Sequence, residues 1–198
     1  MQKPYWLFAA IPLAFGIQQF IEGLLWLEIG LSGEGAHLAG LGFIFFSHVF
    51  WLGWIPLASH AVEPDALRRK LFMGLALVGI ITGVLMYVPL WLHTDWLVVE
   101  QVKHSIVYHL SFFFDGYMPD AFDETLYGLN VLAPLLLSSH LRIRIFGLLV
   151  MTLGVVAALF YSYAFISVWC FFAAILSIYL LYMILQLQQD AEYQESVE

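Results

Sequence analysis

Two amides and a carboxyl lie inside the first long apolar segment of the chain, at Gln18, Gln19 and Glu22. An ionisable side chain at the centre of a membrane helix costs about 2.5 to 3.5 kcal/mol, so it needs a partner, a cavity or a function. At the helical period these three side chains share one face and form a polar stripe. The stripe is the first candidate binding site, for a small ligand, a lipid or a proton-coupled solute.

Further polar residues are expected to face this stripe from neighbouring helices. His48 is the histidine predicted to lie deepest in the membrane, and it follows Ser47 in the second apolar segment. Adjacent antiparallel helices would allow a hydrogen bond between Glu22 and His48. The fourth and sixth apolar segments would add Tyr127, Asn130, Trp169 and Cys170.

Two interpretations of Glu22 stay open. In the first, its carboxyl is hydrogen-bonded to Gln18, Gln19 or His48 and holds the bundle together. In the second, Glu22 exchanges protons or contacts a ligand, because ionisable residues inside a membrane commonly have a function.

Four histidines are predicted to lie at the outer face of the protein, namely His37, His93, His104 and His109. Together with nearby carboxylates they are suitable ligands for zinc, copper or another divalent metal. Their spacing matches no known metal-binding signature, and the alternative is that they hydrogen-bond near the lipid headgroups. A haem or pigment ligated by His48 alone also stays open, so the sequence identifies no cofactor.

The composition indicates a membrane protein. Hydrophobic residues make up 62% of the chain and charged residues 11%, compared with about 45 to 50% and about 25% in soluble domains. We predict an all-α, polytopic transmembrane bundle of about six spanning helices. The net charge of -8 excludes nucleic acid as a partner, because its phosphates require a basic surface.

Six apolar segments are long enough to cross a hydrocarbon core, which takes about 20 helical residues. They lie near residues 5–29, 37–59, 70–91, 120–139, 143–160 and 165–187. We predict a single transmembrane domain over residues 1–189, followed by an acidic cytoplasmic tail over residues 190–198.

The segment 92–119 is predicted to lie outside the membrane as an interfacial or re-entrant element. Alternating apolar residues between His104 and Ser111 allow a pair of strands, whereas the four-residue spacing of Glu100, His104 and Tyr108 favours a helix. Its conformation stays open.

The basic residues predict the orientation, because Lys and Arg are retained on the cytoplasmic side. With a cytoplasmic N-terminus and six spans, every basic residue except Lys103 falls on that side. We therefore predict an inner (cytoplasmic) membrane protein with both termini in the cytoplasm and membrane lipids as its surroundings.

A GxxxG pair, Gly79 and Gly83, lies in the third apolar segment. Such a pair lets helix backbones approach closely. We favour packing within one chain over a dimer face, although a homo-oligomer stays open.

Three sequence blocks resemble the recurring blocks of an uncharacterised family of bacterial integral membrane proteins. They are Phe15-Gly16-Ile17-Gln18-Gln19 with Glu22-Gly23 and Trp26, then Leu135-Leu136-Leu137-Ser138-Ser139-His140, then Ser167-Val168-Trp169-Cys170. The resemblance implies a multi-helix membrane fold without an assigned activity. Members of that family carry one more helix upstream, so we expect the first helix to be missing here or replaced by a partner.

Three classes of function remain open. The first is a membrane protein with an outward-facing polar site that includes Gln18, Gln19, Glu22 and His48. The second is an accessory subunit of a larger membrane complex, with or without a cofactor or pigment. The third is a metal-dependent membrane enzyme that uses the outer histidines.

Overall fold

The computed structural model describes residues 5–31, 35–117 and 122–197, with side chains described as far as residue 186 except for residues 122–124. Its first half contains the helices α1 (Trp6–Ala9), α2 (Ile11–Gly30), α3 (Ala36–Phe45), the π-helical turn η2 (Phe46–Phe50), α4 (Trp51–Val62) and α5 (Ala66–Leu92). A 3₁₀ turn η3 (Thr94–Trp96) leads into the strands β1 (Leu97–Val102) and β2 (Ser105–Leu110). The second half contains α6 (Phe122–Leu136), α7 (Leu141–Phe160), the 3₁₀ turn η4 (Ser162–Ala164) and α8 (Phe165–Val197).

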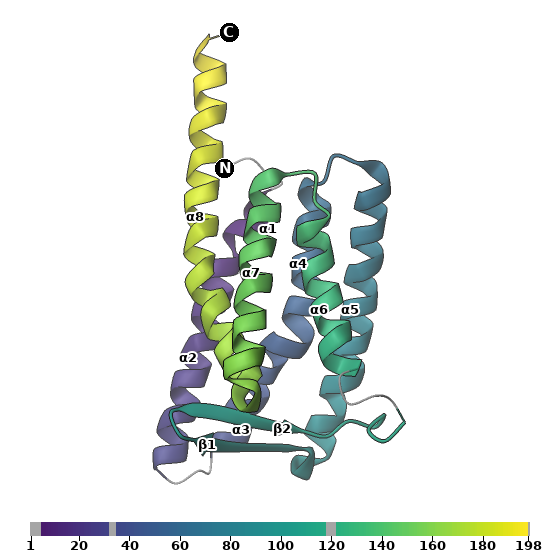
Figure 1. The fold of residues 1–198 in the computed structure, drawn as a ribbon, viewed down its shortest axis with the longest axis vertical. Helices are drawn as coiled ribbons and strands as arrows, with labels where there is room; N and C mark the ends of the chain where they lie inside the picture. Colours follow the sequence, from purple (N-terminus) through teal and green to yellow (C-terminus); the bar gives the residue numbers. More distant parts are fainter. Residues whose placement is uncertain (1–4, 32–34, 118–121, 198) are drawn as a thin grey trace.

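The helices run up and down in one bundle (Figure 1). The α4–α5 and α6–α7 connections lie at the same end as the start of α1 and the last turns of α8. The hairpin and the α7–α8 turn lie at the opposite end. The predicted all-α helical bundle is thus confirmed, and the backbone of the acidic tail continues α8 as helix to Val197.

Five helical segments are long and apolar enough to span a membrane: Trp6–Gly30, Ala36–Val62, Ala66–Leu92, Leu141–Phe160 and Ser162–Gln186. Among the described residues, the sixth helix, α6, has a shorter apolar part, Thr125–Leu136, and it ends before the predicted limit at residue 139. It ends at Leu136 because Ser138 and Ser139 instead bond to the α4–α5 connection.

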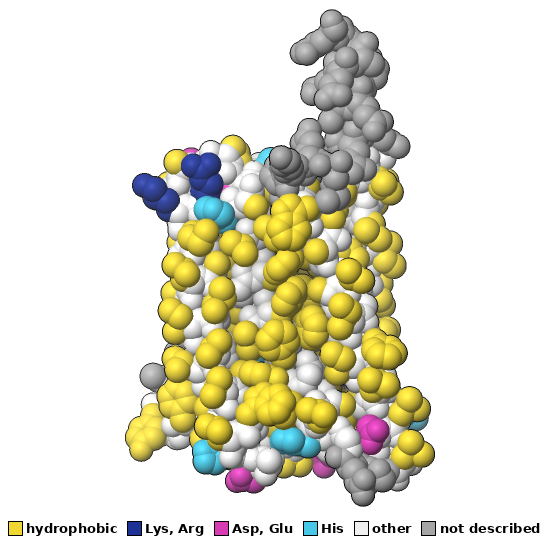
Figure 2. Space-filling model, turned by 180° about the vertical axis from the view of Figure 1, so that it is seen from behind, with side chains coloured by type: hydrophobic (Ala, Val, Ile, Leu, Met, Phe, Trp, Pro, Cys, Tyr) yellow, Lys and Arg dark blue, Asp and Glu magenta, His cyan; other side chains and the backbone are white. Residues whose placement is uncertain are grey.

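The surface separates into an apolar belt and two polar ends (Figure 2). In this view, Lys and Arg side chains gather at one end together with histidine, and most of the visible Asp and Glu side chains lie with further histidines at the other. Exposed apolar side chains along α5, such as Leu77, Ile81 and Leu85, suit contact with lipid. The described part of the chain therefore has the surface of a membrane-spanning protein.

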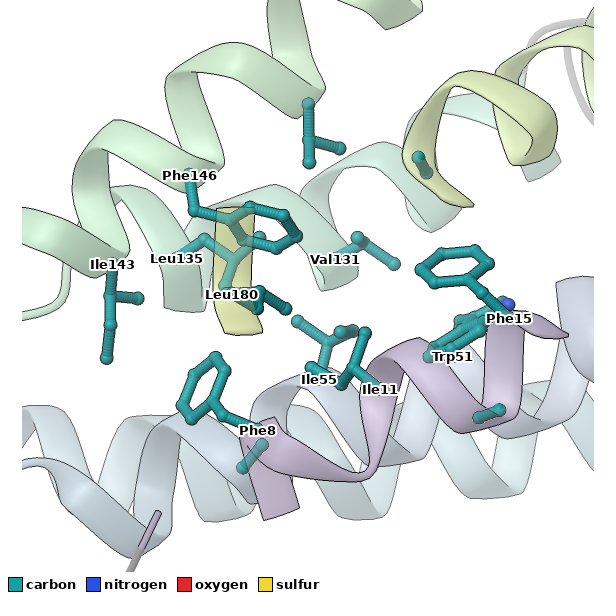
Figure 3. Close-up of a cluster of buried hydrophobic side chains, with 14 of the residues drawn as sticks. Phe8, Ile11, Phe15, Trp51, Ile55, Val131, Leu135, Ile143, Phe146 and Leu180 are labelled. Atoms are coloured by element: carbon teal, nitrogen blue, oxygen red, sulfur yellow. The ribbon is translucent and has the colours of Figure 1, made fainter. Parts of the chain in front are cut away.

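The larger of two buried apolar clusters lies where α1, α2, α4, α6, α7 and α8 meet (Figure 3). At its centre the rings of Phe15 and Trp51 stack with their centroids 4.0 Å apart. Phe8, Ile11 and Phe146 fill the space toward the end of the bundle where the Lys and Arg side chains gather, which we call the basic end. Since lipid is as apolar as these side chains, close packing rather than a hydrophobic driving force holds this cluster together.

A single contact site locks α4, α5 and α6 together. Pro56 lies inside α4 and has no N–H, so the carbonyl of Leu52 lacks its usual intrahelical donor. The side-chain amide of Asn130 in α6 donates to that carbonyl at 2.6 Å. Gly79 in α5 makes room for both groups, because a Cβ there would collide with the Leu52 oxygen and the Asn130 amide.

Gly83, one turn further along α5, packs in the same way against the backbone of His48 and Val49. The GxxxG pair therefore serves packing within the chain, as the sequence favoured.

The segment after α5 forms a β-hairpin that lies across one end of the bundle (Figure 1). Its strands pair from Leu97 opposite Leu110 to Val102 opposite Ser105. Lys103 at the turn has a φ of 56°, the left-handed conformation that tight hairpin turns require. Of the two conformations that the sequence left open for this segment, the pair of strands is the one that forms. The reason is that one face of the hairpin packs on the bundle and buries Leu97, Ile106 and Tyr108.

Replacing Gly79 by Ala is expected to destabilise the protein by about 1 to 3 kcal/mol, because the added methyl group overpacks the contact between α4, α5 and α6. Gly74→Ala is the matched control, since it lies in the same helix and an added Cβ there meets no atom within 4 Å. Thermal unfolding in detergent should show a lower midpoint for Gly79→Ala only. Equal midpoints for the two variants would contradict the close packing at Gly79.

Candidate functional site

The π-helical turn η2 places Ser47 and His48 on the buried side of the second span. Such turns widen a helix locally and are frequent at functional sites. The Ser47 hydroxyl donates to the Ile44 carbonyl at 3.2 Å, and its oxygen lies 2.9 Å from Nδ1 of His48. The hydroxyl of Ser47 has one proton and donates it to the Ile44 carbonyl, so the proton shared with His48 must come from the imidazole. We therefore assign the imidazole proton to Nδ1. Nε2 then carries an unshared electron pair.

A cavity of about 70 Å³ lies beside this imidazole, between η2, α6 and α8. It is lined by Ser47, His48, Tyr127, Phe165, Ile166, Trp169 and Cys170. One water needs about 10 to 15 Å³ of such volume, so the cavity has room for several waters or one small molecule.

Some polar groups in the cavity wall already have a hydrogen-bond partner within the protein, and others do not. Trp169 donates its Nε1–H to the Val150 carbonyl at 3.2 Å, so only its ring is available. Neither Nε2 of His48 nor the hydroxyl of Tyr127 has a hydrogen-bond partner among the described residues. The two rings lie 6.2 Å apart. The cavity therefore offers one acceptor and one hydroxyl within an aromatic enclosure.

A second, apolar cavity of about 30 Å³ adjoins the first. Tyr127, Trp169 and Cys170 form part of the wall of both cavities. The remaining wall of the second is apolar and includes Phe15, Trp51, Ile55, Val131 and Leu135. A molecule with a polar group and a short apolar body would fit this pair of cavities.

Glu22 is not paired with His48, contrary to the expected hydrogen bond. Its carboxyl is buried and accepts a hydrogen bond from the Tyr108 hydroxyl at 3.4 Å, and Ser167 and the expected partner Gln19 also lie beside it. Nδ1 of His48 is instead hydrogen-bonded to the Ser47 hydroxyl. The physical reason is depth, because Glu22 lies near the end of the bundle that the hairpin covers.

Of the two glutamines of the stripe, Gln18 lies toward the cavity wall and Gln19 beside Glu22. Gln18 is fully buried, and its Oε1 accepts from Nε1 of Trp51 at 2.8 Å. The Gln18 amide also lies beside Cys170, which lines the cavity. The Nε2 atoms of Gln18 and Gln19 make no hydrogen bond in the described part of the chain.

The six residues predicted for the ligand site thus separate into three groups. His48 and Tyr127 line the cavity. The stripe of Gln18, Gln19 and Glu22 lies behind its wall. Asn130 instead donates its side-chain amide to the Leu52 carbonyl.

The outer histidines do not come together. His109 pairs with Glu100 on the surface, with 2.9 Å between Nε2 and Oε1, and His93 stacks on Trp96. His104 lies in the hairpin turn and His37 in the first turn of α3. Within residues 5–31, 35–117 and 125–186, no three side chains of His, Cys, Asp or Glu form a group that could hold a metal ion.

Glu63 is a buried carboxylate that the sequence analysis did not identify. It accepts hydrogen bonds from the Ser139 amide at 2.9 Å, the Ser138 hydroxyl at 3.3 Å and the Ser139 hydroxyl. Burial acts to raise the pKa of Glu63, but the hydrogen bonds from Ser139, Asp65 and Ser138 together lower it below the usual value. In the sequence, Glu63 precedes Pro64 and looks like an ordinary loop residue. No pattern of neighbouring residues could therefore have predicted its hydrogen bonds to Ser138 and Ser139.

Comparison with known proteins gives a family but no activity. The family model described as "Family of unknown function (DUF6629)" matches residues 4–195. No curated protein and no solved structure matches the chain.

Replacing Glu22 by Ala should destabilise the protein by about 1 to 3 kcal/mol, because the buried Tyr108 hydroxyl loses its acceptor. Glu22→Gln keeps an acceptor oxygen and should unfold near the wild-type midpoint. Tyr108→Phe combined with Glu22→Ala should cost less than the sum of the two single changes, since both remove one interaction. A loss in Glu22→Gln as large as in Glu22→Ala, measured by thermal unfolding, would show that the proton or charge matters instead.

Proposed function

The chain belongs to DUF6629, a family of unknown function, and we propose that it is a membrane protein that binds a small, uncharged molecule between η2, α6 and α8. The observation that supports this proposal is the unbonded Nε2 of His48 at the wall of an aromatic cavity. A ligand hydroxyl or amide would donate to Nε2, and the Tyr127 hydroxyl would complete the polar contact. The apolar part of the ligand would lie toward the second cavity.

The lining of the cavity favours a neutral ligand. None of the described residues that line it is Asp, Glu, Lys or Arg. A charged ligand would lose its hydration without gaining a counter-ion, which is costly in a buried site. The volume of about 70 Å³ also argues for a few non-hydrogen atoms rather than a whole lipid.

Cys170 gives a direct probe of this cavity, because it lines the wall and is the only cysteine of the chain. Purified protein would be treated with the neutral reagent methyl methanethiosulfonate, with either 2-propanol or acetate present. We expect 2-propanol to slow the modification of Cys170 severalfold, and acetate at equal concentration to have no effect. His48→Leu should abolish the protection, because it removes the acceptor at similar volume.

The matched control is His37→Leu, which changes a histidine in the first turn of α3, remote from the cavity lining, and should keep the protection. Equal protection by 2-propanol and acetate, or protection that survives in His48→Leu, would contradict the proposed site.

We further propose that the protein lies in the inner membrane with both termini in the cytoplasm. Support comes from the charge distribution, since Arg68, Arg69, Lys70, Arg142 and Arg144 lie on the turns at one end, and Lys103 lies on the hairpin at the other.

A cysteine introduced at Lys103 in a Cys170→Ser background tests this orientation, because Lys103 is exposed at the hairpin turn. A membrane-impermeant maleimide added to intact cells should label it. Ala66→Cys, exposed at the start of α5, is the control and should be labelled only after the cells are opened. The reverse pattern would overturn the orientation.

A further inference from the structure

The segment of residues 111–117 follows β2 and lies at the end of the bundle that the hairpin covers (Figure 1). Within these seven residues, Phe112 is the buried side chain, Phe114 is half-buried and the others are exposed. Phe112 nevertheless belongs to neither of the two buried apolar clusters of the described residues. Packing of the core therefore does not account for the burial of this ring.

Phe112 lies instead against the candidate ligand site. Its ring centroid is 6.0 Å from that of the His48 imidazole. Phe165 and Ile166, which line the same cavity as His48, begin α8 directly after η4. Because β2 contacts both η4 and α8, the cavity lies just beneath the hairpin. The ring of Phe112 is thus placed between the cavity and the point where the chain leaves the hairpin.

The hairpin itself is held to the bundle at more than one point. Tyr108 bonds to Glu22 and stacks on Phe43, with the two ring centroids 4.8 Å apart. At the hairpin turn, Nζ of Lys103 lies 5.1 Å from the ring centroid of Tyr163, which is a cation–π contact. The two strands therefore form a fixed frame from which the next segment extends.

The segment 111–117 is folded by hydrogen bonds of its own. The Ser111 N–H still donates to a carbonyl of η3 at 2.9 Å, so the fixed frame reaches as far as this residue. The Phe112 N–H donates to Oδ2 of Asp115 at 2.7 Å, and the Asp115 N–H donates to the Phe112 carbonyl at 3.0 Å. Gly116 has a φ of 83°, which glycine adopts without strain. A short turn with one buried side chain opens at a much lower free energy than the whole fold.

We propose that Phe112 is a gate, which closes the cavity beside His48 toward the hairpin, and that the ligand enters when the turn carries this ring away. The inference rests on the proposed function, because a gate matters only where a ligand binds. An aromatic ring suits this role, since it covers a large apolar area and has no hydrogen bond to His48 that opening would break. The arrangement described above is the closed form.

Diethyl pyrocarbonate tests the gate, because it is uncharged and modifies an unprotonated imidazole nitrogen such as Nε2 of His48. Full-length protein in detergent would be treated with it, and the modification of each histidine followed by mass spectrometry of peptides. His104, which is exposed at the hairpin turn, is the internal reference. Minor open states typically have populations of about 0.1 to 10%, so Phe112→Ala should speed the modification of His48 relative to His104 by about tenfold or more.

Phe113→Ala is the matched control, because it removes the same ring from the next residue, whose side chain is 56% exposed. It should leave the rate at His48 unchanged. Asp115→Ala keeps the Phe112 ring but removes the acceptor of its N–H, and it should speed the modification less than Phe112→Ala does. An unchanged rate in Phe112→Ala, or equal acceleration in Phe113→Ala, would overturn the gate. If thermal unfolding shows that Phe112→Ala does not fold, the rate in Asp115→Ala decides in the same way.

2-Propanol separates the gate from the ligand site. In Phe112→Ala it should slow the modification of His48, because its hydroxyl donates to Nε2, whereas acetate should not. Acceleration without this protection would support the gate and contradict the proposed ligand site. Protection of Cys170 in the wild type, with no acceleration at His48 in Phe112→Ala, would support the ligand site and overturn the gate.

Discussion

The hydrogen bond from Asn130 to the Leu52 carbonyl is the contact on which the arrangement of the bundle depends. Inside a membrane no water is available for a carbonyl that a proline has left without a donor, so another helix must supply one. Gly79 allows α5 to approach the same point, and three helices are held at a single depth. Tyr127 lies one turn before Asn130 on the same face of α6. The bond that anchors α6 therefore also brings Tyr127 to the cavity beside His48.

Most buried polar groups in the described residues join two parts of the fold. Glu22 holds the hairpin through Tyr108, Gln18 holds α2 to the second span through Trp51, and Glu63 joins two connections at the basic end. Each of these bonds stabilises a long-range contact, and each explains a polar residue in an apolar chain. His48 differs, because its ring lines a cavity and only its Nδ1 has a hydrogen-bond partner among the described residues. That difference, rather than burial alone, is what distinguishes a candidate ligand site from structural bonding.

The sequence predicted the elements better than the partners. Apolar length and composition were sufficient to predict an all-α membrane bundle, and helical periodicity identified the stripe at Gln18 and Glu22. The partner of Glu22 could not be predicted, because Tyr108 is 86 residues away in a segment whose conformation the pattern left open. The role of Asn130 was missed for a similar reason, since it depends on the backbone effect of Pro56 in another helix. Local patterns determine which face of a helix is polar, and tertiary packing decides which group it meets.

An experimental map of the protein in lipid nanodiscs, at a resolution that shows ordered water, would test the central claim most directly. The account predicts density that belongs to no side chain within about 3.2 Å of Nε2 of His48, between that atom and Tyr127. It also predicts that the carboxyl of Glu22 faces Tyr108. A map in which the imidazole of His48 is bonded to Glu22, or in which neighbouring side chains fill the cavity, would contradict the account.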